Sequence, residues 1–150
     1  MTLSERIASD LKEAMKAKDE LSLTVLRQIK AAAMNEEIRR GKSLPEEDLT
    51  GVIFSIAKSH KESIESFTKG ARPDLAEKEE KELTVIMKYL PQQLGADEIR
   101  QIVSGAIKET GASSAKDMGK VMGKIMPKVK GKADGGLVNS IVKELLEPPK

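Results

Sequence analysis

Apolar residues recur at intervals of three and four positions from one end of this 150-residue chain to the other. The clearest run holds Leu49, Val52, Ile53, Ile56 and Ala57, which share one face of an α-helix. No alternating apolar and polar run bounded by turn residues predicts a strand. The spacing therefore predicts an all-α protein. Its core is expected to be built from Leu, Ile, Val, Met and Ala, because the chain has only three aromatic residues.

Turn and capping residues divide this pattern into seven helical segments. Three pairs have the spacing of a helix-capping box, and they are Thr2 with Glu5, Asp74 with Glu77, and Ser114 with Asp117. Arg39, Arg40 and Gly41 are typical of a helix C-terminus. The stretch LPQQLGAD, with its proline and glycine, favours a domain boundary. We therefore expect a four-helix N-terminal domain over residues 1–92 and a three-helix C-terminal domain over residues 93–150.

The net positive charge is concentrated in residues 115–132. This segment carries six lysines and one acid, Asp117, whereas the chain as a whole has a net charge of +2, so the rest of the chain sums to −3. We call the six side chains the lysine edge, and they are Lys116, Lys120, Lys124, Lys128, Lys130 and Lys132. The first three are predicted to lie on a helix that stops at Met126, because Pro127 lacks an amide hydrogen. The last three are predicted to share one side of an extended loop, PKVKGKAD.

The methionines and the glycines of this helix need separate explanations. Met118, Met122 and Met126 are expected to face the core, opposite the lysines. Gly119 and Gly123 each cost about 1 kcal/mol in a helix relative to alanine. Either a neighbouring helix packs closely against them, or a phosphate backbone approaches them closely.

The lysine edge differs from an ordinary solvated helix face. A lysine row opposite an apolar stripe can simply serve solvation, but such faces commonly mix signs, as EKEEKE at residues 77–82 does. A single-sign edge predicts a polyanion-binding surface. The scarcity of aromatic residues disfavours base stacking with single strands, and no helix combines a basic face with a bulky apolar one as membrane binders do. A folded RNA recognised by its shape is the expected ligand.

Catalytic and metal-binding patterns are weak in this sequence. There is no cysteine, which excludes disulfides, thiolate metal sites and cysteine nucleophiles. The only histidine, His60, is expected at the edge of the core, because no second histidine or cysteine offers it a metal-binding partner. The adjacent acids at positions 36–37 and 79–80 point in different directions on a helix. The sequence therefore indicates no catalytic centre, metal or cofactor, and without a signal peptide or an apolar span it predicts a cytoplasmic protein.

The run SSAKDMGKVMGKIMPKVKGKADGGLVN closely resembles the signature of the GatB/YqeY family. LRQIKAAAMNEEI and DLAEKEEKELTVIMKYLPQQL resemble the N-terminal half of its stand-alone YqeY members. The resemblance implies a C-terminal domain similar to the GatB tail of the glutamine-dependent aspartyl/glutamyl-tRNA amidotransferase, which docks on the body of tRNA. The implied RNA contacts are Lys120, Lys124, Lys128, Lys130 and Lys132, with Gly119, Gly123 and Gly131 as positions of close approach.

The departures from that enzyme limit the function that the resemblance implies. Neither its ATP-using core nor its Ser-Ser-Lys amidase machinery has a counterpart in this chain. We therefore expect a tRNA-binding accessory protein associated with a carbon–nitrogen ligase that uses glutamine as amido-N donor. Its expected partners are tRNA and an amidotransferase or aminoacyl-tRNA enzyme. Two alternatives stay open: a helical protein–protein adaptor without a nucleic-acid role, and an amidotransferase component that is active only with partner chains.

Overall fold

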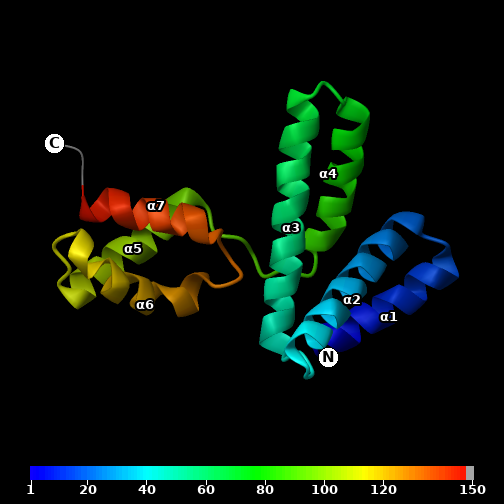
Figure 1. The fold of residues 1–150 in the computed structure, drawn as a ribbon, viewed down its shortest axis with the longest axis horizontal. Coiled ribbons are helices and arrows are strands. Elements are labelled where there is room, and N and C mark those ends of the chain that lie inside the picture. Colours follow the sequence, from blue (N-terminus) through cyan, green and yellow to red (C-terminus); the bar gives the residue numbers. More distant parts are fainter. Residues whose placement is uncertain (148–150) are drawn as a thin grey trace. The chain divides into compact units, whose positions relative to one another are not determined.

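The computed structural model describes residues 1–147, and all regular structure in that range is helical (Figure 1). The helices are α1 (Leu3–Ala17), α2 (Glu20–Arg40), α3 (Glu46–Lys69), α4 (Pro73–Met87), α5 (Ala96–Thr110), α6 (Met118–Val129) and α7 (Gly135–Leu146), with a 3-10 turn, η1 (Ala115–Asp117), before α6. The prediction of an all-α protein is confirmed. No helix among these residues has both the length and the apolar character that crossing a bilayer requires.

The chain forms two compact units, Met1–Leu90 and Pro91–Lys150. Helices α1–α4 lie in the first unit and α5–α7 in the second. Whether each unit folds by itself, as separate domains over residues 1–92 and 93–150 would, stays a prediction.

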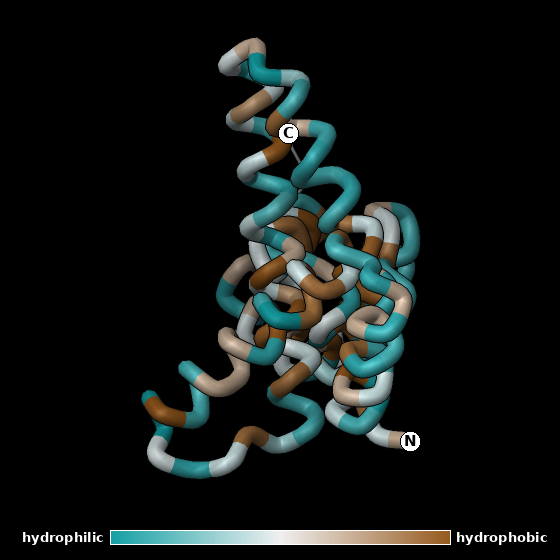
Figure 2. Tube along the Cα trace, turned by 90° about the vertical axis from the view of Figure 1, so that its right-hand side faces the viewer, coloured by the Kyte–Doolittle hydropathy of each residue, from teal (hydrophilic) through white to brown (hydrophobic). Residues whose placement is uncertain are grey.

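Helices α2 and α3 each contact all three other helices of the first unit. Figure 1 shows α1 with α2 and α3 with α4 as two antiparallel pairs. Leu26 of α2, Ile53 of α3 and Ile86 of α4 are among the largest fully buried side chains. In Figure 2 the apolar positions, drawn brown, gather inside the bundles and the polar ones outside. The core is thus aliphatic, as the sequence predicted.

One aromatic side chain joins the end of α4 to α1. Tyr89 is buried, and its hydroxyl donates a hydrogen bond of 2.7 Å to Oδ2 of Asp10. The guanidinium carbon of Arg6 lies 4.8 Å from the centre of the tyrosine ring, within range of a cation–π contact. Burial raises the pKa of Tyr89, and the hydrogen bond to Asp10 raises it further. The phenol therefore stays protonated and acts as a donor.

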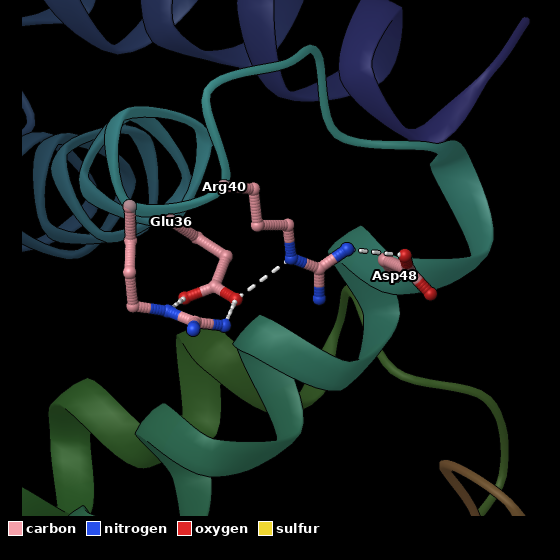
Figure 3. Close-up of polar contacts among 4 residues, drawn as sticks. Glu36, Arg40 and Asp48 are labelled. Atoms are coloured by element: carbon pink, nitrogen blue, oxygen red, sulfur yellow. Dashed lines mark hydrogen bonds and ion pairs between the residues drawn. The ribbon is translucent and has the colours of Figure 1, made fainter.

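An arginine links α2 to α3 across the connection between them (Figure 3). Arg40 donates from Nε to Glu36, 2.8 Å away, and from Nη1 to Asp48 on α3, 2.6 Å away. Gly41 follows with φ 71° and caps α2, as predicted. Glu36 also accepts hydrogen bonds from Arg39, and Arg39 and then Arg40 lower the pKa of Glu36 from 4.5 to about 2. The carboxylate is therefore ionised at neutral pH.

The three predicted capping boxes have different outcomes. The pair of Thr2 and Glu5 is confirmed by both of its hydrogen bonds. The prediction at Asp74 is wrong, because α4 already begins at Pro73, a residue pre-organised for the first helical position, and Asp74 binds Arg72 at 3.2 Å instead. The prediction at Ser114 is also wrong. A 3-10 turn comes before α6, and Asp117 instead accepts a hydrogen bond from the Ser113 amide, 3.0 Å away.

The predicted stop at Met126 is wrong as well. Helix α6 continues through Pro127 to Val129. Proline removes one hydrogen bond near the end of the helix, whereas continuing the helix buries Val129 in the core. The amide of Lys130 still donates to the carbonyl of Met126, 2.9 Å away. Packing therefore decides where α6 ends.

Tyr89→Phe should lower the free energy of unfolding by about 1 kcal/mol, because it removes the hydrogen bond to Asp10 and keeps the buried ring. Urea unfolding with an unchanged slope would measure this. Asp10→Asn should cost a similar amount, and the double variant should cost less than the two single variants together. Fully additive costs would contradict the proposed contact.

Glu36→Gln should destabilise the protein at neutral pH, and the deficit should shrink in acid. The pKa of Glu36 is about 2 in the folded protein and ordinarily 4.5, so its stabilising effect is fully present above pH 4.5 and is lost as the pH falls toward 2. Chemical unfolding of both proteins at a series of pH values would measure the difference. A deficit that stays constant down to pH 2 would contradict the role of the Glu36 pairs.

Candidate nucleic-acid interface

The core of the second unit determines how α6 faces solvent. Helices α5, α6 and α7 contact one another pairwise, and Val121 and Ile125 of α6 are fully buried between them. Met118 and Met122 pack against this core, as predicted. The prediction for Met126 is wrong, because its side chain is 44% exposed and Val129 takes the inward position three residues later. The inner face of α6 is therefore mainly β-branched.

Most of the lysine edge lies on the exposed surface of η1 and α6. Lys120, Lys124 and Lys128 are exposed and follow one another at four-residue spacing, so they form a row along α6. At 1.5 Å per residue, successive members rise by about 6 Å. Lys116 lies in η1 and Lys130 directly follows α6, and both are exposed. The structure thus groups five of the six predicted lysines along one short helix and its two ends.

The end of the segment differs from the predicted extended loop. Lys128 is helical, and Gly131 turns the chain with φ 75°. The carbonyl of Gly131 accepts from Gln93 Nε2 at 2.9 Å, and the carbonyl of Lys132 accepts from the Leu94 amide at 2.8 Å. These bonds hold the turn against the start of the unit, and Lys132 is only partly exposed. The prediction that Lys128, Lys130 and Lys132 share one side of an extended chain is therefore wrong.

Two acids lie beside the lysine row. Lys120 Nζ is 3.9 Å from Asp117, and Lys124 Nζ is 3.3 Å from Glu109 of α5. The Ser113 amide and then Lys120 contribute to a lowered pKa of Asp117. All four side chains have some solvent exposure, and such pairs contribute at most about 1 kcal/mol each. A ligand with several phosphates can therefore compete for these lysines.

The two glycines of α6 form an open strip beside the lysine row. Gly119 and Gly123 are exposed, and a Cβ atom built at either position would meet no heavy atom within 4 Å. Within residues 1–147, the close packing of a neighbouring helix therefore does not explain them. Met126 lies three residues beyond Gly123 and continues the strip. Gly131 has a different reason to be glycine, since its positive φ strains other residues.

Sequence reasoning missed the surroundings of His60. The histidine is buried, as predicted, but Glu82 and Glu79 of α4 lie beside its ring. Glu82 is itself buried, and it lies about one turn before the core positions Val85 and Ile86 of α4. The position of Glu82 one turn before buried apolar residues was the sequence signal that could have indicated its burial.

Comparison with known proteins identifies a family and several relatives of this chain. Residues 4–146 match the family model described as Yqey-like protein. A Saccharomyces cerevisiae protein named altered inheritance of mitochondria protein 41, mitochondrial, is 32% identical over 151 residues, which cover 94% of this chain and 82% of the relative. A protein of the same name from Lachancea thermotolerans is 41% identical over 87 residues, which cover 57% of this chain and 46% of the relative.

These names correct one prediction. The relatives are named as mitochondrial proteins, which contradicts the predicted cytoplasmic location. A helical composition without a membrane span suits more than one compartment, so it was a poor guide to location. The resemblance seen in the sequence is confirmed by the match over residues 4–146 and by a relative that covers nearly the whole chain. The chain belongs to the YqeY-like protein family.

Proposed function

We propose that the protein is a tRNA-binding accessory factor that contacts RNA phosphates through the lysine edge. The observation that carries the proposal is the concentration of six lysines and one acid in residues 115–132, with five of the lysines exposed on η1, α6 and the residue after it. Lysine contacts with phosphates supply affinity without reading sequence. Such a surface suits a ligand recognised by its shape.

The glycine strip supports the same proposal. Gly119 and Gly123 have no side chain, so a phosphate backbone can come close to the surface of α6 there. Any other residue at these positions would keep it further away. Coulomb attraction increases as the distance between charges falls. Close approach beside the lysine row therefore brings phosphates within reach of more of its lysines. The smooth strip and the charged row act together as one surface.

The proposed role is accessory. Lysine ammonium groups on an exposed helix hold phosphates, but they supply neither an activated nucleophile nor a general base. The link to amidotransferase chemistry rests on family resemblance. We therefore assign the protein to binding tRNA together with an amidotransferase or aminoacyl-tRNA enzyme that performs the reaction.

One observation favours a second candidate function, that of a protein–protein adaptor. Met126 is 44% exposed and continues the glycine strip, so α6 also offers a small apolar surface. Flexible methionine side chains suit protein docking. Dependence on salt separates the two functions, because phosphate contacts weaken as salt rises and apolar contacts hardly change.

Replacing Lys120, Lys124, Lys128, Lys130 and Lys132 with alanine should abolish salt-sensitive tRNA binding. For the unaltered protein, about five phosphate contacts predict a loss of affinity of roughly 100-fold or more between about 50 and 200 mM salt. Fluorescence titration with bulk tRNA at several salt concentrations would measure both effects. Helical circular dichroism should be retained, because these side chains lie outside the core.

The matched control removes the same charge from the first unit. It replaces five exposed lysines with alanine, namely Lys12, Lys16, Lys30, Lys61 and Lys78. This control should keep most of its affinity. Equal losses of tRNA affinity in the two variants would show that binding depends only on net charge. That result would overturn the assignment of the site. Absence of tRNA binding at low salt would overturn the proposed function.

Changing Gly119 and Gly123 to alanine should have opposite effects on folding and binding. The helix should gain about 1 kcal/mol per substitution, because the added methyl groups meet no other atoms. Affinity for tRNA should fall about tenfold, the worth of one charge-assisted contact. Thermal unfolding and tRNA titration would measure the two effects.

Gly105→Ala in α5 is the control for these substitutions, since that glycine is also helical and open. It should stabilise the helix and leave tRNA affinity unchanged. Unchanged affinity in the Gly119 and Gly123 variant would show that RNA does not approach this strip.

A further inference from the structure

A polar cluster lies where the apolar core of the first unit ends. In the apolar cluster of the first unit, the buried residues of α3 end at Ala57 and those of α4 begin at Val85, and Ala76 is buried separately nearer the α3–α4 loop. Beyond them the α3–α4 hairpin extends to its loop (Figure 1), and its tip combines polar and apolar positions in Figure 2. His60 and Glu82 lie one turn beyond the core on their respective helices. Polar contacts between α3 and α4 therefore begin at the edge of this apolar cluster.

Three side chains converge there. The His60 side chain is 6% exposed and that of Glu82 is 10% exposed. Nε2 of His60 is 3.1 Å from Oε2 of Glu82 and 3.5 Å from Oε2 of Glu79. One potential metal-binding atom from each residue lies within 4.8 Å of the others. Residues 1–147 contain no other such group of three histidine, cysteine or acidic side chains.

The histidine ring has a defined orientation. Nδ1 lies 3.0 Å from the carbonyl oxygen of Ile56, one turn earlier on α3. A carbonyl oxygen only accepts hydrogen bonds, so Nδ1 must carry the hydrogen. In the neutral ring, Nε2 then points a lone pair toward two carboxylates. Three electron-rich atoms that converge in this way either share a proton or form the donor set of a metal ion.

Charge balance favours the metal ion. A divalent cation with a neutral imidazole and two carboxylates leaves no net charge. The carbonyl of Ile56 holding Nδ1–H is also the arrangement that commonly orients a metal-binding histidine.

We infer that His60, Glu79 and Glu82 bind a divalent transition-metal ion, of which Zn²⁺ is the best fit. Tetrahedral zinc with bonds of about 2.0–2.2 Å places its donor atoms about 3.3–3.6 Å apart, close to the separations of Nε2 from the two carboxylates. The side chain of Glu79 is 23% exposed, so the cluster is reachable from solvent. Three protein ligands leave the fourth position to water. The ion would join α3 to α4 beyond the apolar core.

Zinc titration of the full chain tests this inference without using RNA. Protein stripped with EDTA and dialysed should bind one equivalent of ZnCl₂ by isothermal titration calorimetry, and its unfolding temperature should rise. CoCl₂ should produce the intense visible absorption of four-coordinate Co²⁺. The chain has one histidine and no cysteine, so a site with an imidazole or thiolate ligand must include His60.

Substitutions locate the site. His60→Ala should abolish the visible Co²⁺ bands, and Glu82→Gln should weaken Zn²⁺ binding at least tenfold. Glu79→Gln should do the same, and it tests the site even if the two buried substitutions prevent folding, because Glu79 is partly exposed. Glu80→Gln is the matched control, since it removes one charge from an exposed neighbour on the same helix, and it should leave binding unchanged.

Two results would overturn the inference. One is the absence of both zinc binding and visible Co²⁺ bands in the unaltered protein, which would leave a proton as the cation on Nε2. The other is an equal loss in Glu79→Gln and Glu80→Gln, which would indicate general attraction of cations to an acidic helix.

Discussion

Burial of branched aliphatic side chains is the interaction on which both units depend. Leu26 and Ile53 in the first unit and Val121 and Ile125 in the second are almost or completely inaccessible to solvent. Because successive helical residues are about 100° apart, turning Val121 and Ile125 inward also determines which residues of α6 face outward. The lysine row and the glycine strip occupy their positions as a result of this packing. The same burial leaves polar residues at the margin of the core, where His60 and Glu82 meet.

The elements whose signals are local could be predicted from the sequence. A long apolar stripe, a capping box at Thr2 and a left-handed glycine after Arg40 each act within a few residues. Helix ends that depend on distant residues could not. Burial of Val129 stabilises α6 beyond a proline that would stop an isolated helix, and the sequence analysis weighed the proline above the position of Val129 four residues after Ile125. Tyr89 similarly binds Asp10, 79 positions earlier in the chain.

The candidate site shows the same limit. Spacing within one helix was enough to place Lys120, Lys124 and Lys128 in a row. It could not reveal Glu109, which reaches Lys124 from another helix, or the bonds that draw Lys132 toward the start of the unit. The carboxylates beside His60 come from another helix too, and both belong to the run EKEEKE, which the sequence analysis took as a solvated face although Glu82 is buried. Single-helix geometry is thus readable from the sequence, whereas contacts between helices need the fold.

The open surroundings of Gly119 and Gly123 have an evolutionary consequence. Neither glycine fills a packing role within residues 1–147, and alanine at either position would make the helix more stable. The fold therefore sets no requirement for glycine at either position. During evolution, a substitution at either position would therefore change the outer surface of α6 and leave its core packing as it is.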